Sequence, residues 1–198
     1  MMERFEAFAT ILRNLGVDTS RQITLLDLGC GEGRLVTSAL SRGIDAYGCD
    51  VDFGSVWINQ DSMSELLTEN RVRKIPAPYP LRQADTNSDY RLPFDSGFFD
   101  VIISNQVMEH VHNISEVAAE MHRVLKPGGT FLHMFPPKWG LIEGHIGVPL
   151  GGALSSDRWL TLWARLGVRN IYQKGFSAEA TVAWNRKFLD TAVNYHLT

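Results

Sequence analysis

The sequence has little cysteine and no excess of basic residues. Cys30 and Cys49 are the only cysteines in 198 residues, so the chain lacks the disulfide framework of a small secreted domain. Its 19 basic and 22 acidic residues leave a net charge of −3, which gives no general attraction to phosphate backbones or anionic membranes. We therefore expect no nucleic acid and no membrane among its partners.

Long uncharged apolar runs are also missing. The first fifteen residues include Glu3, Arg4, Glu6 and Arg13, which interrupt any signal-peptide core. No run elsewhere approaches the roughly 18 to 20 apolar residues that cross a bilayer. Together with the unpaired cysteines, these absences favour a soluble, cytoplasmic protein.

The hydrophobic content of 44% is sufficient for one well-filled core, and the length is short for two. We therefore expect a single domain over residues 1–198. It would consist of an amphipathic N-terminal helix at 1–16, a core at 23–136, and a segment of loop and helices at 137–198.

The core alternates short apolar runs with helical patterns. Apolar runs predict strands at 23–28, 44–49, 98–104 and 130–135, and a weaker one at 79–84, where prolines limit pairing. Helical spacing predicts helices at 35–40, 56–67 and 114–125. This alternation predicts an α/β fold of the Rossmann-like, doubly wound type, with a mainly parallel sheet and helices on both faces.

The pattern changes after residue 135. A Gly- and Pro-rich stretch to Gly152 predicts a long loop, and helices are expected near 157–166 and 178–195. Residues 167–176 suggest one strand. Arg71, Arg73 and Lys74 form the densest basic cluster, which we interpret as a solvated helix end.

The chemistry-bearing motif is Asp27-Leu28-Gly29-Cys30-Gly31-Glu32-Gly33, at the end of the first predicted strand. Doubly wound sheets bind ligands at the carboxyl ends of their strands, and glycines allow close approach of a ligand to the backbone. Asp50, which ends the second strand, stands where an acidic side chain can accept hydrogen bonds from ribose hydroxyls. A glycine turn without a ligand is the alternative.

The glycine spacing argues against a pyrophosphate. Arg34 stands where the dinucleotide fingerprint G-x-G-x-x-G has its last glycine, so a nicotinamide-dependent oxidoreductase is the weaker alternative. A sulfonium cofactor has an amino-acid end instead of phosphates. Asp27 could hold the ammonium of that end, directly or through water, while N–H groups of the loop face its carboxylate.

Five motifs in order resemble those of class I S-adenosylmethionine-dependent methyltransferases, most closely the type 11 methyltransferase domain group. They are Leu-Asp-Leu-Gly-Cys-Gly-x-Gly, then Gly48-Cys49-Asp50, Ala84-Asp85, Leu92-Pro93-Phe94 with Phe99-Asp100-Val101-Ile102, and Glu109-His110-Val111 with Arg123 to Gly129. The resemblance spans roughly residues 23–136. It implies that S-adenosyl-L-methionine is the cofactor.

The resemblance also implies which residues bind that cofactor. Gly29, Cys30, Gly31 and Gly33 would form the loop, and Asp50 with Val51 would hold the ribose. Asp85 and Thr86 would lie at the adenine, although Asp85 could equally be a turn residue. Asn105 is the choice among the polar residues that end the fourth strand, near the transferable methyl group.

Methyl transfer needs an aligned nucleophile, and a base only where the acceptor carries a proton. His110 and His145 are the candidate bases, because histidine titrates near neutral pH. A structural role for His110 is an open alternative. Glu143 could bind acceptor polar groups and Trp139 could stack on a flat substrate, or their loop could simply pack on the C-terminal helices. No group of residues has metal-ligand spacing, so we expect no metal.

The end of the chain departs from the family pattern. The family's sheet ends in an antiparallel hairpin, which here is either missing or replaced by helices. A bared sheet edge would favour a homo-oligomer. The expected activity is methyl transfer to a small-molecule acceptor; the alternative is a non-catalytic S-adenosylmethionine-binding or scaffold protein that retains the fold.

Overall fold

The computed structural model describes residues 3–19, 21–51, 65–75, 90–111 and 113–193. The chain divides into two compact units, which are treated separately below. Unit 1 consists of Met1–Tyr79, Asp85–Val107 and Asn113–Met134. Unit 2 consists of Pro80–Ala84, Met108–His112 and Phe135–Thr198. The expectation of a single domain stays a prediction.

Unit 1 contains a five-stranded sheet in the order β3-β2-β1-β4-β5, with every pair parallel. The reversal of strand order beside β1 is the topological switch point at which doubly wound folds bind ligands. The predicted α/β, parallel, Rossmann-like fold is confirmed. The strands are β1 (Thr24–Leu28), β2 (Asp45–Asp50), β3 (Val72–Lys74), β4 (Phe99–Asn105) and β5 (Leu125–Met134).

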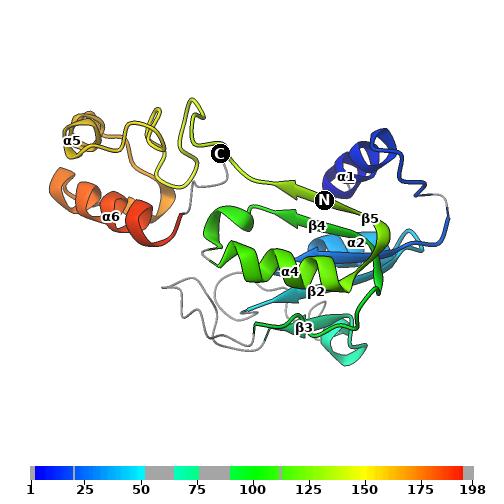
Figure 1. The fold of residues 1–198 in the computed structure, drawn as a ribbon. Helices are drawn as coiled ribbons and strands as arrows, with labels where there is room; N and C mark the ends of the chain where they lie inside the picture. Colours follow the sequence, from blue (N-terminus) through cyan, green and yellow to red (C-terminus); the bar gives the residue numbers. More distant parts are fainter. Residues whose placement is uncertain (1–2, 20, 52–64, 76–89, 112, 194–198) are drawn as a thin grey trace. The chain divides into compact units, whose positions relative to one another are not determined.

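Helices cover both faces of this sheet (Figure 1). On one face α1 (Glu3–Asn14) packs beside α2 (Arg34–Leu40), and both contribute to a core with β1, β2 and β4. On the other face lies α4 (Ile114–Val124), whose Val117, Met121 and Val124 are buried. Their spacing of four and three residues places these side chains on one helical face, which is why the sequence pattern identified this helix.

The basic cluster was wrongly assigned to a helix end. Val72, between Arg71 and Arg73, is 2% exposed, and β3 runs parallel to β2 with Val72 opposite Gly48. Arg71 forms an ion pair with Asp45, and Arg73 donates to the carbonyl of Pro93 at 2.6 Å. Charged side chains on both sides of a buried valine are compatible with a short edge strand, because alternate residues face opposite sides.

Two other predicted elements lie wholly or partly outside the described residues. The weak strand at 79–84 is outside them. Of the helix predicted at 56–67, residues 65–68 are helical and the remainder is outside.

Strand β5 begins five residues earlier than predicted. Leu125 pairs with Phe99 and Thr130 pairs with Val101, so the intervening residues form an irregularity in the ladder. Gly128 lies there with φ of 79°, a conformation that glycine adopts without a steric penalty. The motif that ends the helix therefore also starts the strand.

Unit 2 is helical around a small core of its own. Ile146, Val148 and Leu160 are its fully buried centre, and Trp159, Trp163 and Trp184 are among the side chains that pack on it. Its elements are η1 (Met108–His110), α5 (Asp157–Arg165), η2 (Ile171–Gln173) and α6 (Ala178–Thr191).

The strand suggested at 167–176 is wrong. The segment forms the short helix η2, because Asn170 accepts a hydrogen bond from the Tyr172 N–H and Gln173 reaches back to the Asn170 N–H. Among residues 135–193, strand pairing is limited to an isolated bridge between Ile142 and Pro149. The described part of the chain thus contains no C-terminal hairpin, and the self-association expected of a bared edge stays a prediction.

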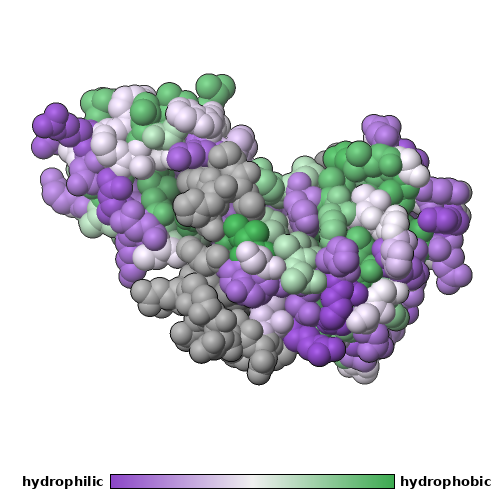
Figure 2. Space-filling view, in the orientation of Figure 1, coloured by the Kyte–Doolittle hydropathy of each residue, from purple (hydrophilic) through white to green (hydrophobic). Residues whose placement is uncertain are grey.

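The surface of each unit mixes polar and apolar residues on the face shown in Figure 2. Within the described ranges, no helix combines the length and the apolar character that a bilayer span requires.

Candidate functional site

The glycine loop of unit 1 follows β1 directly, at the carboxyl edge of the sheet. Gly29, Gly31 and Gly33 have φ of 75°, 50° and 67°, which is the left-handed region that side chains with a Cβ rarely adopt. The N–H groups of Gly29 and Cys30 donate to the carbonyl of Cys49 at 2.8 and 3.1 Å. The loop is therefore tied to the end of β2 and turns sharply into α2.

Two glycines of this loop serve different physical purposes. A Cβ on Gly29 would lie 2.3 Å from a methyl carbon of Val107, so this position is needed for packing inside unit 1. A Cβ on Gly31 would meet nothing within 4 Å. Gly31 thus leaves open space above the backbone, as a loop that receives a ligand requires.

Asp50 stands beside this open space. One oxygen of its carboxylate accepts from the Gly31 N–H at 2.7 Å, and the other accepts from the Val51 N–H at 2.7 Å. An ionised carboxylate can accept about four hydrogen bonds, hydroxyl donors included. Asp50 therefore holds the loop in shape and can also bind a ribose.

Asp27 is the buried acid of the same edge. Asp27 is 5% exposed. This burial raises the pKa of its carboxyl to about 7, and the nearby negative charge of Asp50 acts in the same direction. A cation placed beside the carboxylate would reverse this shift. These groups fit the ammonium of a nucleoside that carries an amino acid. Asp27, Gly31 and Asp50 are the residues that would hold such a nucleoside.

The two cysteines are packing residues. Both are buried free thiols, and burial raises the pKa of each, so neither is an activated nucleophile. The Cys30 sulfur occupies the space in which a side chain on Gly48 would lie, since a Cβ there would be 2.8 Å from it. Cys30 thereby supports the loop from below.

The other residues implied for the cofactor site have different outcomes. Asn105 ends β4 opposite Met134, at the same carboxyl edge of the sheet as the glycine loop. Asp85 and Thr86 lie outside the described residues. Ser104, the residue before Asn105, is fully buried and forms a hydrogen bond of 2.6 Å with His133.

Asp100 stands at the opposite end of β4, away from the carboxyl edge. It accepts from the Thr24 N–H at 2.9 Å and from Lys126 at 2.8 Å, and these contacts, against its partial burial, hold the pKa of its carboxyl below the usual range. It ties β1, β4 and β5 together at their starts.

Both candidate bases belong to unit 2. His110 lies in η1, and its Nδ1 is 2.5 Å from the carbonyl oxygen of Ala192. A carbonyl can only accept, so Nδ1 carries the proton and a neutral His110 presents a lone pair at Nε2. His110 is thereby fixed in one tautomer by the end of α6.

His145 is fixed in the same way by Glu143. One oxygen of the Glu143 carboxylate is 2.7 Å from His145 Nδ1, and the other accepts from the N–H groups of His145 and Ile146 at 2.9 and 2.7 Å. The Glu143 hydrogen bond raises the pKa of His145. Glu143 is itself buried, so it orients His145 and stiffens the loop, and Nε2 is the free nitrogen of that ring.

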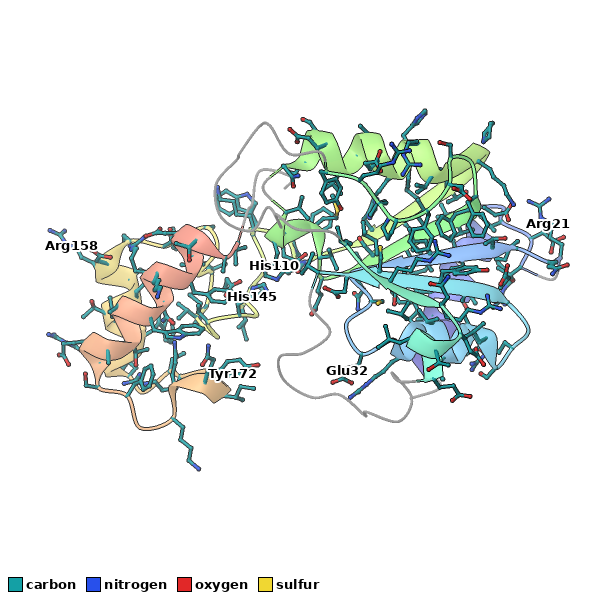
Figure 3. All side chains as sticks on the ribbon, turned by 90° about the horizontal axis from the view of Figure 1, so that it is seen from below. Arg21, Glu32, His110, His145, Arg158 and Tyr172 are labelled. Atoms are coloured by element: carbon teal, nitrogen blue, oxygen red, sulfur yellow. The ribbon has the colours of Figure 1, made fainter. Side chains whose placement is uncertain are left out.

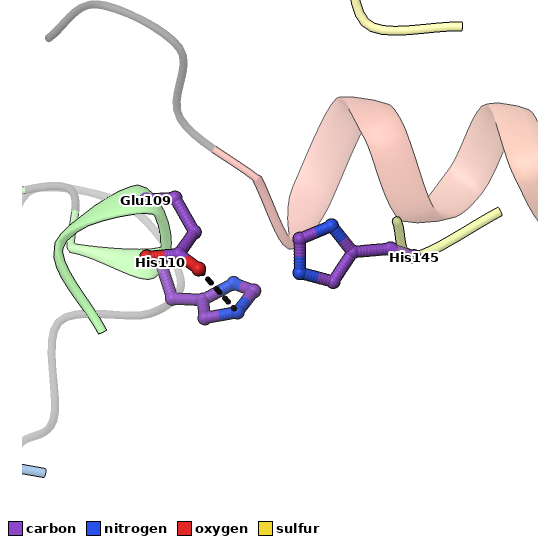
Figure 4. A group of neighbouring side chains, drawn as sticks. All are labelled: Glu109, His110 and His145. Atoms are coloured by element: carbon purple, nitrogen blue, oxygen red, sulfur yellow. Dashed lines mark ion pairs between the residues drawn. The ribbon is translucent and has the colours of Figure 1, made fainter. Parts of the chain in front are cut away.

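Glu109 is the member of this region that the sequence analysis missed. Its side chain is 1% exposed, and neither carboxylate oxygen has a hydrogen-bond partner among the described residues. Figure 4 shows it with His110 and His145, which Figure 3 also labels; the two rings meet edge to face with centroids 5.1 Å apart. The pair Glu109-His110 was visible in the sequence, but thirty-five residues separate His145 from it.

Trp139, expected as a stacking residue, is 71% exposed. Whether it meets a substrate stays a prediction.

Comparison with known proteins places this geometry in context. A family model described as a methyltransferase domain matches residues 26–133, which includes the second half of β1, the glycine loop, β2, β4 and nearly all of β5. An uncharacterized methyltransferase of Mycolicibacterium paratuberculosis is 30% identical over 144 residues, covering 69% of this chain and 49% of its own. A sterol 4-C-methyltransferase of Caenorhabditis elegans is 24% identical over 116 residues, covering 59% and 32%.

A solved structure of geranyl diphosphate C-methyltransferase from Streptomyces coelicolor A3(2), with Mg2+, geranyl diphosphate and S-adenosyl-L-homocysteine, is 24% identical. It has a TM-score of 0.42 over 65% of this chain and 44% of that one. The chain spans about half the length, or less, of the curated relatives it matches.

Proposed function

The chain belongs to the class I S-adenosylmethionine-dependent methyltransferases, through their methyltransferase domain, and on that premise we propose that it transfers a methyl group from S-adenosyl-L-methionine to a small-molecule acceptor. The observation that carries the proposal is the carboxyl edge of unit 1. There an open glycine loop, a hydrogen-bonded Asp50 and a buried Asp27 converge.

These residues match the chemical groups of the cofactor. The Gly31 region leaves room for the amino-acid end, where N–H groups of a turn favour a carboxylate. Asp27 would neutralise the ammonium, and the Asp50 carboxylate would accept from the ribose hydroxyls. When bound, the cofactor supplies an electrophilic methyl group on a sulfonium centre.

The protein's contribution to such a transfer is alignment. Displacement at carbon requires the acceptor atom, the methyl carbon and the sulfur in one line, and holding them so can supply several kcal/mol. Where the acceptor is a hydroxyl or an ammonium, a base must also take its proton. His110 and His145 each have an Nε2 lone pair that can accept a proton or coordinate a cation.

A small molecule is the proposed acceptor class because the sequence has no basic excess with which to bind nucleic acid. Two similar proteins support the same class, since their names specify a sterol and geranyl diphosphate.

A non-catalytic role is the second candidate. Within the described residues, the sheet of unit 1 ends at β5. A protein of this kind could bind the cofactor, as a scaffold or sensor, without transferring the methyl group.

Titration calorimetry with S-adenosyl-L-homocysteine tests cofactor binding. We expect 1:1 binding by the unaltered chain and a loss of at least about 100-fold in affinity for Gly31→Val, since a branched side chain would fill the open space and strain a backbone at φ of 50°. Asp50→Ala should weaken binding similarly. Arg158→Ala, on α5, is the matched control and should bind normally.

Turnover separates the two candidates. The chain is incubated with S-adenosyl-L-methionine and a panel of hydroxyl, amine and carbon acceptors, and mass spectrometry detects any product heavier by one methylene. Binding without any methylated product across the panel would support the scaffold role. Absence of S-adenosyl-L-homocysteine binding would contradict both.

A further inference from the structure

We propose that Glu109, His110 and His145 form a binding site for a divalent transition-metal ion, with Zn2+ as the best fit. One ligand atom from each residue lies within 4.8 Å of the other two. All three residues belong to unit 2, so the site stands independently of the cofactor edge in unit 1 and does not rest on the proposed function.

The first support is the state of Glu109. A carboxylate that is 1% exposed and has no hydrogen-bond partner among the described residues is costly to keep charged, because burial removes it from bulk water. The Nε2 of His110 is 4.0 Å from Oε1 of Glu109, beyond hydrogen-bond distance (Figure 4). A cation between these atoms would supply the missing partner.

The second support is the orientation of the two histidines. Ala192 and Glu143 each engage the Nδ1 of one ring, so both rings are left with Nε2 lone pairs. With both rings neutral, three electron-pair donors then converge. This is the arrangement that a metal ion requires.

The third support is the outer shell of the site, the groups that hold the two histidines in place. Metal-binding histidines commonly donate their other ring N–H to a carboxylate or a backbone carbonyl, which fixes the ring and strengthens it as a ligand. Both versions occur here: the Glu143 carboxylate holds His145, and the Ala192 carbonyl holds His110. Glu143 is itself held by two backbone N–H groups, so the support is rigid.

The donor set selects the ion. Imidazole nitrogens suit Zn2+ and neighbouring first-row ions, whereas Mg2+ and Ca2+ prefer oxygen. Bonds of about 2.1 Å in a tetrahedral arrangement would hold the ligand atoms about 3.4 Å apart, so the side chains must close by about 1 Å. Three protein ligands leave a fourth position for water. With the ion bound, neither imidazole is a free base.

The experiment uses the full chain, with any affinity tag removed and metal extracted by a chelator. Co2+ is titrated while its visible absorption is followed, since four-coordinate Co2+ absorbs far more strongly than the aqueous ion. Zn2+ affinity is then measured by displacement of Co2+. We expect a 1:1 site with a Kd for Zn2+ below about 1 μM.

Variants show whether these three residues hold the ion. Glu109→Gln keeps the side-chain shape and should weaken Zn2+ at least about 100-fold, as should His145→Ala. Glu143→Gln, which changes only the outer shell, should weaken it about 10- to 100-fold. His122→Ala removes an exposed histidine of α4 and should change nothing. Thermal melts of each variant confirm folding.

Several results would overturn the site: a Zn2+ Kd weaker than about 100 μM, Co2+ absorption like that of the aqueous ion, or equal affinity in Glu109→Gln and the unaltered chain. Binding of S-adenosyl-L-homocysteine, measured on the same samples, keeps the two proposals apart. Loss of metal binding with normal nucleoside binding would reject this site alone.

Discussion

The two units use carboxylates in parallel ways. Each has one carboxylate that accepts two backbone N–H groups, through both oxygens in Asp50 of unit 1 and through one oxygen in Glu143 of unit 2. Each also has a second, buried carboxylate whose pKa burial raises, Asp27 and Glu109. The first kind shapes a loop, and the second kind is suited to a cation: an ammonium in unit 1, a metal ion in unit 2.

The difference lies in how the residues are spaced along the chain. In unit 1, Asp27 and the glycine loop are contiguous and Asp50 ends the next strand, so one motif identifies the site. In unit 2, Glu109 and His145 come from segments thirty-five residues apart. The two sites are therefore similar in chemistry, but the site in unit 1 is easier to predict from the sequence than the site in unit 2.

The largest expected effect comes from adding a side chain to a crowded glycine. It compares the glycine loop of unit 1 with the loop of unit 2 that contains Gly151. Gly29→Ala would place a Cβ 2.3 Å from Val107 at φ of 75°, so we expect a loss of about 2–4 kcal/mol in the free energy of unfolding. Gly151→Ala in unit 2 would approach Glu143 at 3.1 Å without a positive φ, and should lose about 1 kcal/mol.

Urea unfolding of both variants measures this difference. Gly31→Ala, in open space, is the matched control and should lose about 1 kcal/mol from backbone strain alone. Equal losses at positions 29 and 31 would show that packing against Val107 does not constrain the loop.

The next effect concerns Asp27 and pH. In the protein without ligand, its folded pKa of about 7 exceeds the ordinary value of 3.8, so the folded state retains a proton that the unfolded state releases. Stability should then fall as pH rises from about 4 to 7 and level off above 7. Asp27→Asn removes this decline, and the variant should gain about 2–3 kcal/mol relative to the unaltered chain between pH 5 and pH 8.

Glu109→Gln gives the corresponding experiment in unit 2. Its pKa is also raised by burial, so stability without metal should change with pH in the same direction. Denaturant titrations at pH 5 and pH 8 check both variants. A gain for one variant and none for the other would break the parallel between the units.

The same Asp27→Asn variant should bind S-adenosyl-L-homocysteine about 10- to 100-fold more weakly at pH 8, the loss of a hydrogen bond to a charged group. Because the ligand's ammonium favours the ionised carboxylate, the affinity of the unaltered chain should fall about tenfold per pH unit below 7. Calorimetry at pH 6 and pH 8 measures both. A pH-independent affinity would remove Asp27 from the ammonium site.

The sequence predicts part of this structure and misses the rest, for physical reasons. The order of strands and helices in unit 1 follows from apolar periodicity, and the glycine loop from its motif. β3 was missed because its only buried residue, Val72, lies among charges whose partners come from distant segments. The proposed metal ligands could not be predicted for a similar reason: no spacing rule links Glu109 to His145, and only the fold of unit 2 brings them together.

The smallest expected effect concerns a charge pair that serves neither kind of site. Arg71 pairs with Asp45 and lies 4.8 Å from the centre of the Tyr47 ring, but both charged side chains are about 30% exposed. Water and salt screen such pairs, so Arg71→Ala should lower the free energy of unfolding by only about 0.5–1 kcal/mol, and by less in 1 M salt. Urea titrations at two salt concentrations measure this, with Arg71→Lys separating charge from guanidinium stacking. Affinity for S-adenosyl-L-homocysteine should not change. A loss as large as that of Gly29→Ala would mean that the edge strand, and not the ligand loop, limits the stability of unit 1.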